Sequence, residues 1–180
     1  MTASLPDLSG RPVEASDRNR FLSVYGHLFE HSPWVVERAW ALGPFADAKA
    51  LHAAFLQVVE QADAAERLSL VRAHPQLADK AAIAAGLTAS SASEQSSAGL
   101  DRLTAAEFQA FHALNRAYQQ RFGFPFIICV RLHDKTGILA AMRDRLVRAP
   151  DDELAEALVQ VGLIARLRLG DVRLPQEAAR

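Results

Sequence analysis

The sequence predicts an all-α fold: a single globular domain of about eight helices with no significant sheet. Apolar residues recur along most of the chain at the three- and four-residue spacing of one helix face. Residues that cap helices precede most of these stretches. Only one short run has a β-like composition. The length of 180 residues suits one domain with one sizeable core.

The expected elements follow from this spacing. Residues 1–15 form a leader with little periodicity, residues 16–170 form the helical domain, and residues 171–180 form a tail. The expected helices run over about 17–30, from Ser32-Pro33 to 42, 48–62, 64–73, from Ser90 or Ser91 through Gln95, 104–122, 136–148 and 151–170.

Capping boxes place two helix starts. Asp63 is followed three residues later by Glu66, and Thr104 by Glu107, so each pair can satisfy two otherwise unpaired backbone N–H groups. The other starts are expected at single residues: Ser16, Ser32, Asp47, Ser90 or Ser91, Thr136 and Asp151.

The β-like run extends from Phe124 to Val130. It is apolar, contains β-branched residues, and carries Pro125 near its start. No second run could pair with it. We therefore expect a buried extended segment, not part of a sheet.

Composition excludes several classes of function. The formal net charge is −1, and there is no basic patch for nucleic acid and no polybasic membrane patch. No apolar run approaches the roughly 20 residues that cross a bilayer. The single cysteine, Cys129, rules out an intramolecular disulfide. With no signal peptide evident, a cytoplasmic protein is expected.

His74 is the first candidate for chemistry. Pro75 disfavours helical backbone at the preceding residue, so a helix should end at His74 and leave its ring in a fixed position. An unperturbed histidine has a pKa near 6.5, which suits a general acid or base. A surface or capping histidine is the ordinary alternative.

Ser91, Glu94 and Gln95 form the second candidate. A carboxylate, an amide and backbone N–H groups could converge on a ligand rich in nitrogen and oxygen. A solvated helix N-terminus would favour the same residue types.

Backbone groups and arginines complete the candidates. The segment after Phe122 has N–H and C=O groups without helical partners, which must bond to something.

Arg166 and Arg168 lie about 200° apart around a helix, so only one can face a given pocket. That arginine could bind a substrate carboxylate, whereas the alternative is two solvated arginines.

A metal site is not favoured by the sequence. His27 and His31 have the spacing of two ligands on one helix face. However, His31-Ser32-Pro33 crosses an expected helix boundary, and no third ligand is indicated. Phosphate-binding glycine loops and G-x-S-x-G nucleophile turns are also absent from the sequence.

Five segments occur in an order that is specific as a set. They are Phe29-Glu30-His31-Ser32-Pro33-Trp34, Ala73-His74-Pro75-Gln76-Leu77-Ala78, Ser93-Glu94-Gln95, Phe122-Gly123-Phe124-Pro125-Phe126-Ile127-Ile128-Cys129-Val130 and Ala165-Arg166-Leu167-Arg168-Leu169. Together they resemble the OHCU decarboxylase family over about residues 16–170. Its members act on 2-oxo-4-hydroxy-4-carboxy-5-ureidoimidazoline, the last intermediate of urate oxidation to allantoin.

The resemblance implies an all-α enzyme with no cofactor or metal, usually a homodimer. It implies that His74 is the catalytic acid or base and that Glu94 assists it. A C-terminal arginine would bind the departing carboxylate, with Arg168 favoured over Arg166. The residues implied to line the substrate pocket are Pro75, Ser91, Gln95, Phe126, Ile127, Ile128, Cys129 and Val130.

The implied reaction suits these residue types. Decarboxylation leaves electrons on carbon and usually needs a cofactor as the electron sink. The C=N and carbonyl groups of the imidazoline ring can take up that charge. The alternatives are a non-catalytic helical ligand-binding or interaction protein on the same scaffold, or the preceding hydrolysis of 5-hydroxyisourate. A helical chain speaks against the latter, which belongs to a β-rich fold.

Overall fold

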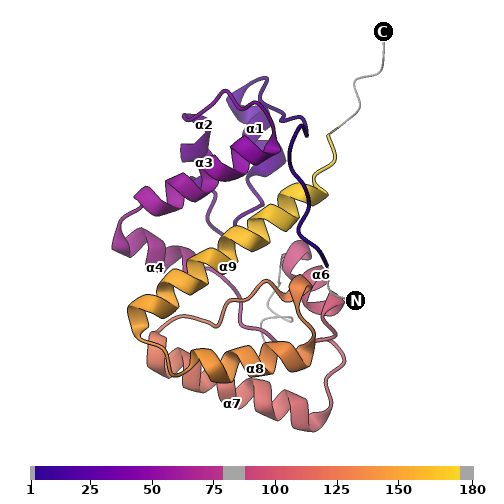
Figure 1. Cartoon of the computed structure of the whole chain (residues 1–180), viewed down its shortest axis with the longest axis vertical. Helices are drawn as coiled ribbons and strands as arrows, with labels where there is room; N and C mark the ends of the chain where they lie inside the picture. The colour runs from indigo at the N-terminus through magenta and orange to yellow at the C-terminus, as the bar shows by residue number, and fades with distance from the viewer. Residues whose placement is uncertain (1–2, 79–87, 175–180) are drawn as a thin grey trace. The chain divides into compact units, whose positions relative to one another are not determined.

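The computed structural model describes residues 3–78 and 88–174 (Figure 1). These residues form eight α-helices and one 3-10 turn, and they contain no β-strand, which confirms the all-α prediction. The elements are α1 (Arg18–Tyr25), α2 (Trp34–Trp40), α3 (Ala48–Gln61), α4 (Ala64–Arg72), α6 (Ala89–Ser97), α7 (Ala105–Phe122), η1 (Val130–Leu132), α8 (Lys135–Arg145) and α9 (Pro150–Asp171).

The chain divides into two compact units, and helix α9 contributes to both. Residues 62–163 with the first residues up to 4 form unit 1, and residues 5–61 with those from 164 onward form unit 2. Each unit is described by itself below. The sequence leaves open whether residues 76–89 include a short helix, and residues 79–87 lie outside the described part of the chain.

Unit 2 is built on α1, α2 and α3, which pack together. Its core contains Phe21, Tyr25 and Phe55, all nearly inaccessible to solvent. Residues 5–15 of the leader dock on this unit. Leu8 is buried, and the Gly10 N–H donates to the Asp47 carboxylate at 2.9 Å.

Unit 1 contains the packed pair α7 and α8 and the extended segment that follows α7 (Figure 1). Tyr118 lies at the centre of an aromatic cluster, with ring centroids 4.6, 5.8 and 5.3 Å from those of Phe122, Phe124 and Phe126. Gly123 ends α7 at φ 73°, a left-handed conformation that glycine adopts without penalty. The chain can therefore turn directly from the helix into the buried segment.

The capping boxes were predicted correctly, but two single caps lie earlier than expected. Asp63 and Thr104 both form their capping boxes. The actual cap of α6 is Thr88, not Ser90 or Ser91, and the actual cap of α8 is Asp134. Adjacent polar residues can each serve as a cap, so sequence alone does not select one of them.

Both ends of α1 were also wrong, as were the caps expected at Ser32 and Asp151, since Pro33 caps α2 and α9 begins at Pro150. Asp17, not Ser16, caps α1, which ends at Tyr25 and not near residue 30. Residues 26–33 form turns, and His31 has a positive φ of 46°. The apolar residues Leu28 and Phe29 that extended the predicted helix are buried, but from turn backbone.

Candidate active site

His74 lies just beyond the C-terminal end of α4 and is half-buried. Its backbone N–H donates to the Val71 carbonyl at 3.3 Å, so the last turn is tightened before Pro75. Its ring Nδ1 lies 3.2 Å from the Leu70 carbonyl oxygen. A carbonyl oxygen can only accept, so Nδ1 carries the proton in the neutral ring. Nε2 is then the nitrogen that can take up or deliver a proton.

The chain after His74 is held by helices α6 and α7. Ala78 has a positive φ of 55°, and its buried N–H donates to Gln95 Oε1 at 3.0 Å. The preceding carbonyl, that of Leu77, accepts from Asn115 Nδ2 at 2.8 Å. Side chains from two helices thus fix the segment that carries the histidine.

Helix α6 presents its predicted polar residues as one group. Ser91 and Gln95 lie one turn apart on its buried face, and Glu94 beside them is half-buried. Because Oε1 of Gln95 accepts the Ala78 N–H, the orientation of the amide is fixed with Nε2 as its donor end. The predicted polar cluster is therefore present on α6.

The extended segment Phe126–Val130 is buried at every residue. Its 3-10 continuation, η1, packs against α6. At its other end, Arg72 at the end of α4 donates from Nε to the Gly123 carbonyl at 3.0 Å. Unit 1 therefore connects the three predicted pieces of the site: the His74 turn, helix α6 and this segment.

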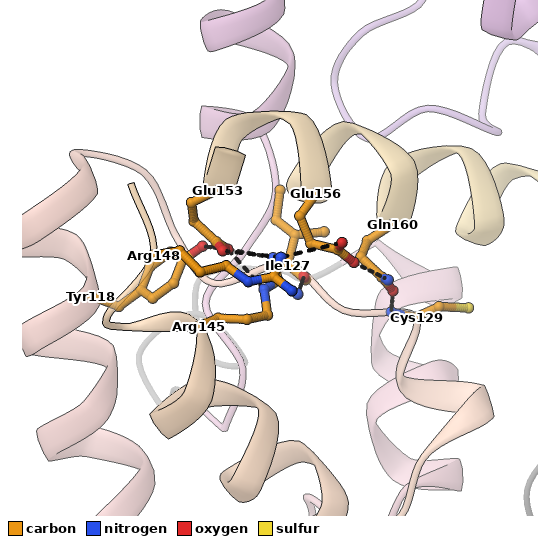
Figure 2. A network of polar contacts seen from close by, with 8 residues as sticks. All are labelled: Tyr118, Ile127, Cys129, Arg145, Arg148, Glu153, Glu156 and Gln160. Carbon is orange, nitrogen blue, oxygen red and sulfur yellow. Dashed lines mark hydrogen bonds and ion pairs between the residues drawn. The ribbon is translucent and has the colours of Figure 1, made fainter. Parts of the chain in front are cut away.

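A buried polar network lies beside that segment (Figure 2). Glu153 is fully inaccessible, and its Oε1 accepts from Arg145 Nε at 2.8 Å and Nη2 at 2.5 Å. The Tyr118 hydroxyl donates to the same oxygen. The Arg145 guanidinium also lies 4.5 Å from the centroid of the Phe126 ring. Each nitrogen of the Arg145 guanidinium is thus engaged within the protein interior.

The network shifts the titration of its members. Burial, followed by the hydrogen bond to Glu153 and its negative charge, raises the pKa of Tyr118 far above its usual range. Glu156 and Gln160 lie at the solvent-facing side of the network (Figure 2). The hydrogen bond that Gln160 donates to Glu156 lowers the pKa of Glu156. Tyr118 therefore stays protonated as a donor to Glu153.

Asn115 and the Glu153 network were missed at the level of sequence. Asn115 lies on the apolar stripe of α7, between the buried Phe111 and Tyr118. Glu153 precedes the buried Ala157 and Val161 by one and two helical turns. A polar residue on an apolar stripe is the signal that could have identified both.

The two candidate arginines belong to unit 2 and have different surroundings there. Arg168 is 5% exposed, and its Nη1 contacts Glu30 Oε2 at 3.0 Å and the Leu28 carbonyl at 3.3 Å. Arg166 is half-buried and binds the Pro6 carbonyl of the leader through Nε and Nη2, at 3.3 and 3.0 Å. A role for either residue in substrate binding stays a prediction.

The two histidines considered as metal ligands do not share a helix. Both are exposed in the turns after α1. Partial desolvation of the ring, followed by the nearby Arg168 charge, lowers the pKa of His27. Across residues 3–78 and 88–174, no group of three histidine, cysteine or acidic side chains could hold an ion.

In the same residues no helix is both long and apolar enough to span a bilayer.

These features define an all-helical protein with a candidate site of histidine, carboxylate, amide and backbone groups. The family model of OHCU decarboxylase matches residues 14–170. A relative named 2-oxo-4-hydroxy-4-carboxy-5-ureidoimidazoline decarboxylase, from Halalkalicoccus jeotgali, is 37% identical over 94% of each chain. One of the same name from Haloferax volcanii is 38% identical over 92% of this chain and 96% of the relative. The chain therefore belongs to the OHCU decarboxylase family.

Solved structures show the same fold. The crystal structure of (S)-allantoin synthase is 32% identical, with a TM-score of 0.63 over 84% of this chain. The match spans 49% of that protein, about half of its length. A structure of OHCU decarboxylase in the presence of (S)-allantoin has a TM-score of 0.66 over 86% of this chain and 96% of its own. At 23% identity, this second likeness concerns the fold alone.

Proposed function

We propose that this protein is a carboxy-lyase of urate degradation, which converts 2-oxo-4-hydroxy-4-carboxy-5-ureidoimidazoline to (S)-allantoin and CO2. The observation that carries the proposal is family membership over residues 14–170, with the predicted polar residues connected within one unit. The named relatives from Halalkalicoccus jeotgali and Haloferax volcanii match along nearly their whole length.

His74 is the proposed acid or base. The Leu70 carbonyl holds Nδ1 as a donor, so Nε2 can exchange a proton with the substrate. As the bond to the carboxylate carbon breaks, its electron pair passes into the C=N and carbonyl groups of the ring. A proton must then reach carbon from one face, which makes the product optically active. The ring serves as the electron sink, so the proposal requires no cofactor.

Glu94, Ser91 and Gln95 are proposed to orient the substrate. Gln95 Nε2 is the donor end of a fixed amide, which suits the carbonyl oxygen of a ureido or ring group. Glu94 can accept from the substrate hydroxyl or a ring N–H. Pro75 and Phe126 to Val130 would form the surrounding walls, and Arg168, or Arg166, would bind the departing carboxylate.

A homodimer and a cytoplasmic location are part of the same proposal. The family resemblance supports the first, and the single cysteine in the sequence suits a reducing compartment. Light scattering coupled to size-exclusion chromatography would measure the mass directly. A mass near 19.6 kDa, that of one chain, would contradict the dimer.

A coupled assay tests the activity. Urate oxidase and 5-hydroxyisourate hydrolase generate the substrate, and circular dichroism follows the appearance of optically active allantoin. We expect His74→Ala to fold normally but to lose the enzyme-dependent signal, because the residual decay of the substrate is not stereospecific. Exposed His112 on α7 supplies the control, and His112→Ala should retain activity. Full turnover by His74→Ala would remove that residue from the mechanism.

A further inference from the structure

The buried polar network reaches the backbone of the extended segment at two points (Figure 2). Arg145, the last residue of α8, donates from Nη1 to the Ile127 carbonyl at 2.8 Å. Gln160, on α9, accepts the Cys129 N–H at its Oε1 at 2.9 Å. Side chains from two helices therefore hold the peptide groups on either side of Ile128.

Peptide geometry then sets the direction of the Ile128 groups. The peptide bonds that flank Ile128 are trans. In a planar trans peptide the C=O and N–H bonds point in opposite directions. Since the Ile127 carbonyl points to Arg145, the Ile128 N–H points away from Arg145. Since the Cys129 N–H points to Gln160, the Ile128 carbonyl points away from Gln160.

Ile128 thus presents a donor and an acceptor on the side opposite the network. The residue is 4% exposed, and within the described part of the chain neither group forms a hydrogen bond. Buried backbone groups are nearly always paired with protein, water or a ligand. A donor and an acceptor on one extended residue match a ligand with adjacent C=O and N–H groups, as in an amide or ureido group.

The residues that hold the segment are themselves held. Arg145 is fixed by Glu153 through Nε and Nη2 and is stacked on Phe126. Gln160 donates from Nε2 to Glu156 Oε1 at 2.8 Å, which directs Oε1 toward Cys129. Both contacts to the segment are therefore preorganised, which is the condition for aligning a substrate accurately.

We propose that Arg145 and Gln160 are positioning residues that fix the Ile128 N–H and C=O as a binding pair for the amide or ureido part of the substrate. Neither side chain touches the substrate; each acts through a neighbouring peptide group. The identity of the substrate rests on the proposed function, whereas the positioning of Ile128 does not.

Gln160→Leu tests this role, because it keeps the side chain bulky but removes the acceptor for the Cys129 N–H. We expect a folded protein whose kcat/KM is about tenfold to a hundredfold lower, mainly through a higher KM. Affinity for allantoin, measured by calorimetry, should fall in parallel. A lower melting temperature with unchanged KM and unchanged allantoin affinity would overturn the proposal, since it would leave Gln160 a purely structural role.

A charge-neutral exchange supplies the matched rescue. In Glu156→Gln/Gln160→Glu, the new carboxylate at 160 can accept both the Cys129 N–H and the amide N–H of residue 156. The number of charges is unchanged. Both hydrogen bonds are restored, but residue 156 now donates to residue 160 instead of accepting from it. We expect KM and allantoin affinity to return to nearly the wild-type values. Failure of this folded variant to recover either value would contradict the role of the Cys129 hydrogen bond.

Amide NMR separates this inference from the proposed activity. In wild type the Cys129 amide should be protected from hydrogen exchange, and allantoin should shift the Ile128 amide resonance. In Gln160→Leu the protection should be lost and the shift reduced. If wild type showed both signals without decarboxylating the proposed substrate, the proposed activity would be wrong. The proposed positioning of Ile128 would still be correct. Turnover by wild type without any Ile128 shift would mean that the activity is correct and that Ile128 does not bind the substrate.

Discussion

Two buried arginine–glutamate pairs use residues of the same helix, α9, but differ in what the arginine holds besides its glutamate. In unit 1, Arg145 binds Glu153 through Nε and Nη2 and the Ile127 carbonyl of the extended segment through Nη1. In unit 2, Arg168 binds Glu30 and the Leu28 carbonyl, both in the turns after α1, through Nη1. Both arginines are about 5% exposed.

The difference indicates separate tasks for the two pairs. Every nitrogen of the Arg145 guanidinium has a protein acceptor, and a tyrosine hydroxyl adds a third donor to Glu153, so this pair suits a structural support. Desolvating a buried pair costs several kcal/mol, and the three hydrogen bonds to Glu153 Oε1 offset part of this cost. For Arg168 the proposed task is different: it is the favoured candidate, over Arg166, for binding the substrate carboxylate.

The largest expected effect is the loss of Glu153. Glu153→Ala would leave the Arg145 charge buried without its counter-charge and should lower the free energy of unfolding by about 3–5 kcal/mol. Urea denaturation followed by circular dichroism measures this value. Asp152→Ala, at the exposed neighbouring position, is the control and should change stability by less than about 0.5 kcal/mol. If Glu153→Ala changed the free energy of unfolding as little as Asp152→Ala, the network would make no net contribution to stability.

A paired arginine substitution tests the division of tasks. Lysine keeps the charge but loses the planar donor arrangement. Arg168→Lys should lower kcat/KM about tenfold to a hundredfold, because a charged hydrogen bond to the substrate carboxylate is lost. Arg145→Lys should instead lower the free energy of unfolding by about 2 kcal/mol and raise KM, because the contact to the Ile127 carbonyl is weakened, while kcat changes little. If Arg168→Lys retained full activity while losing stability, the two pairs would have the same structural task.

The features that could be predicted are those encoded by residues close together in the sequence. The start of helix α7 was predicted from Thr104 and Glu107, because a capping box acts within a few residues of its own position. The same is true of the turn at His74-Pro75. The extended segment was predicted from its composition and the absence of a partner strand.

The network around Glu153 could not be predicted in the same way. Tyr118 and Glu153 are 35 residues apart, and Arg145 precedes Glu153 by eight. Periodicity identifies which face of a helix is buried, but it does not identify which buried polar residues meet across the core. The role of the Arg145 and Gln160 side chains in holding the extended segment likewise depends on tertiary packing.

The smallest expected effect concerns the hydroxyl that Tyr118 donates to Glu153. Burial and then Glu153 raise the pKa of Tyr118, and the opposing influence of Arg145 is smaller. Unfolded tyrosine ionises near pH 10, so above about pH 10 the folded state retains a proton that the unfolded state loses, and stability falls with rising pH. Tyr118→Phe should cost about 1–2 kcal/mol at pH 7 and flatten this alkaline decline.

Urea titrations at pH 7, 9, 10 and 11 measure that slope, with the wild-type protein as reference. Burial also raises the pKa of Tyr25, so Tyr25→Phe in unit 2 is the matched control. It should remove only the part of the alkaline decline in stability that Tyr25 causes. An unchanged alkaline slope in Tyr118→Phe would mean that Tyr118 ionises alike in the folded and unfolded states. The hydroxyl would then not be held by Glu153, and the position of Glu153 would depend on Arg145 without help from Tyr118.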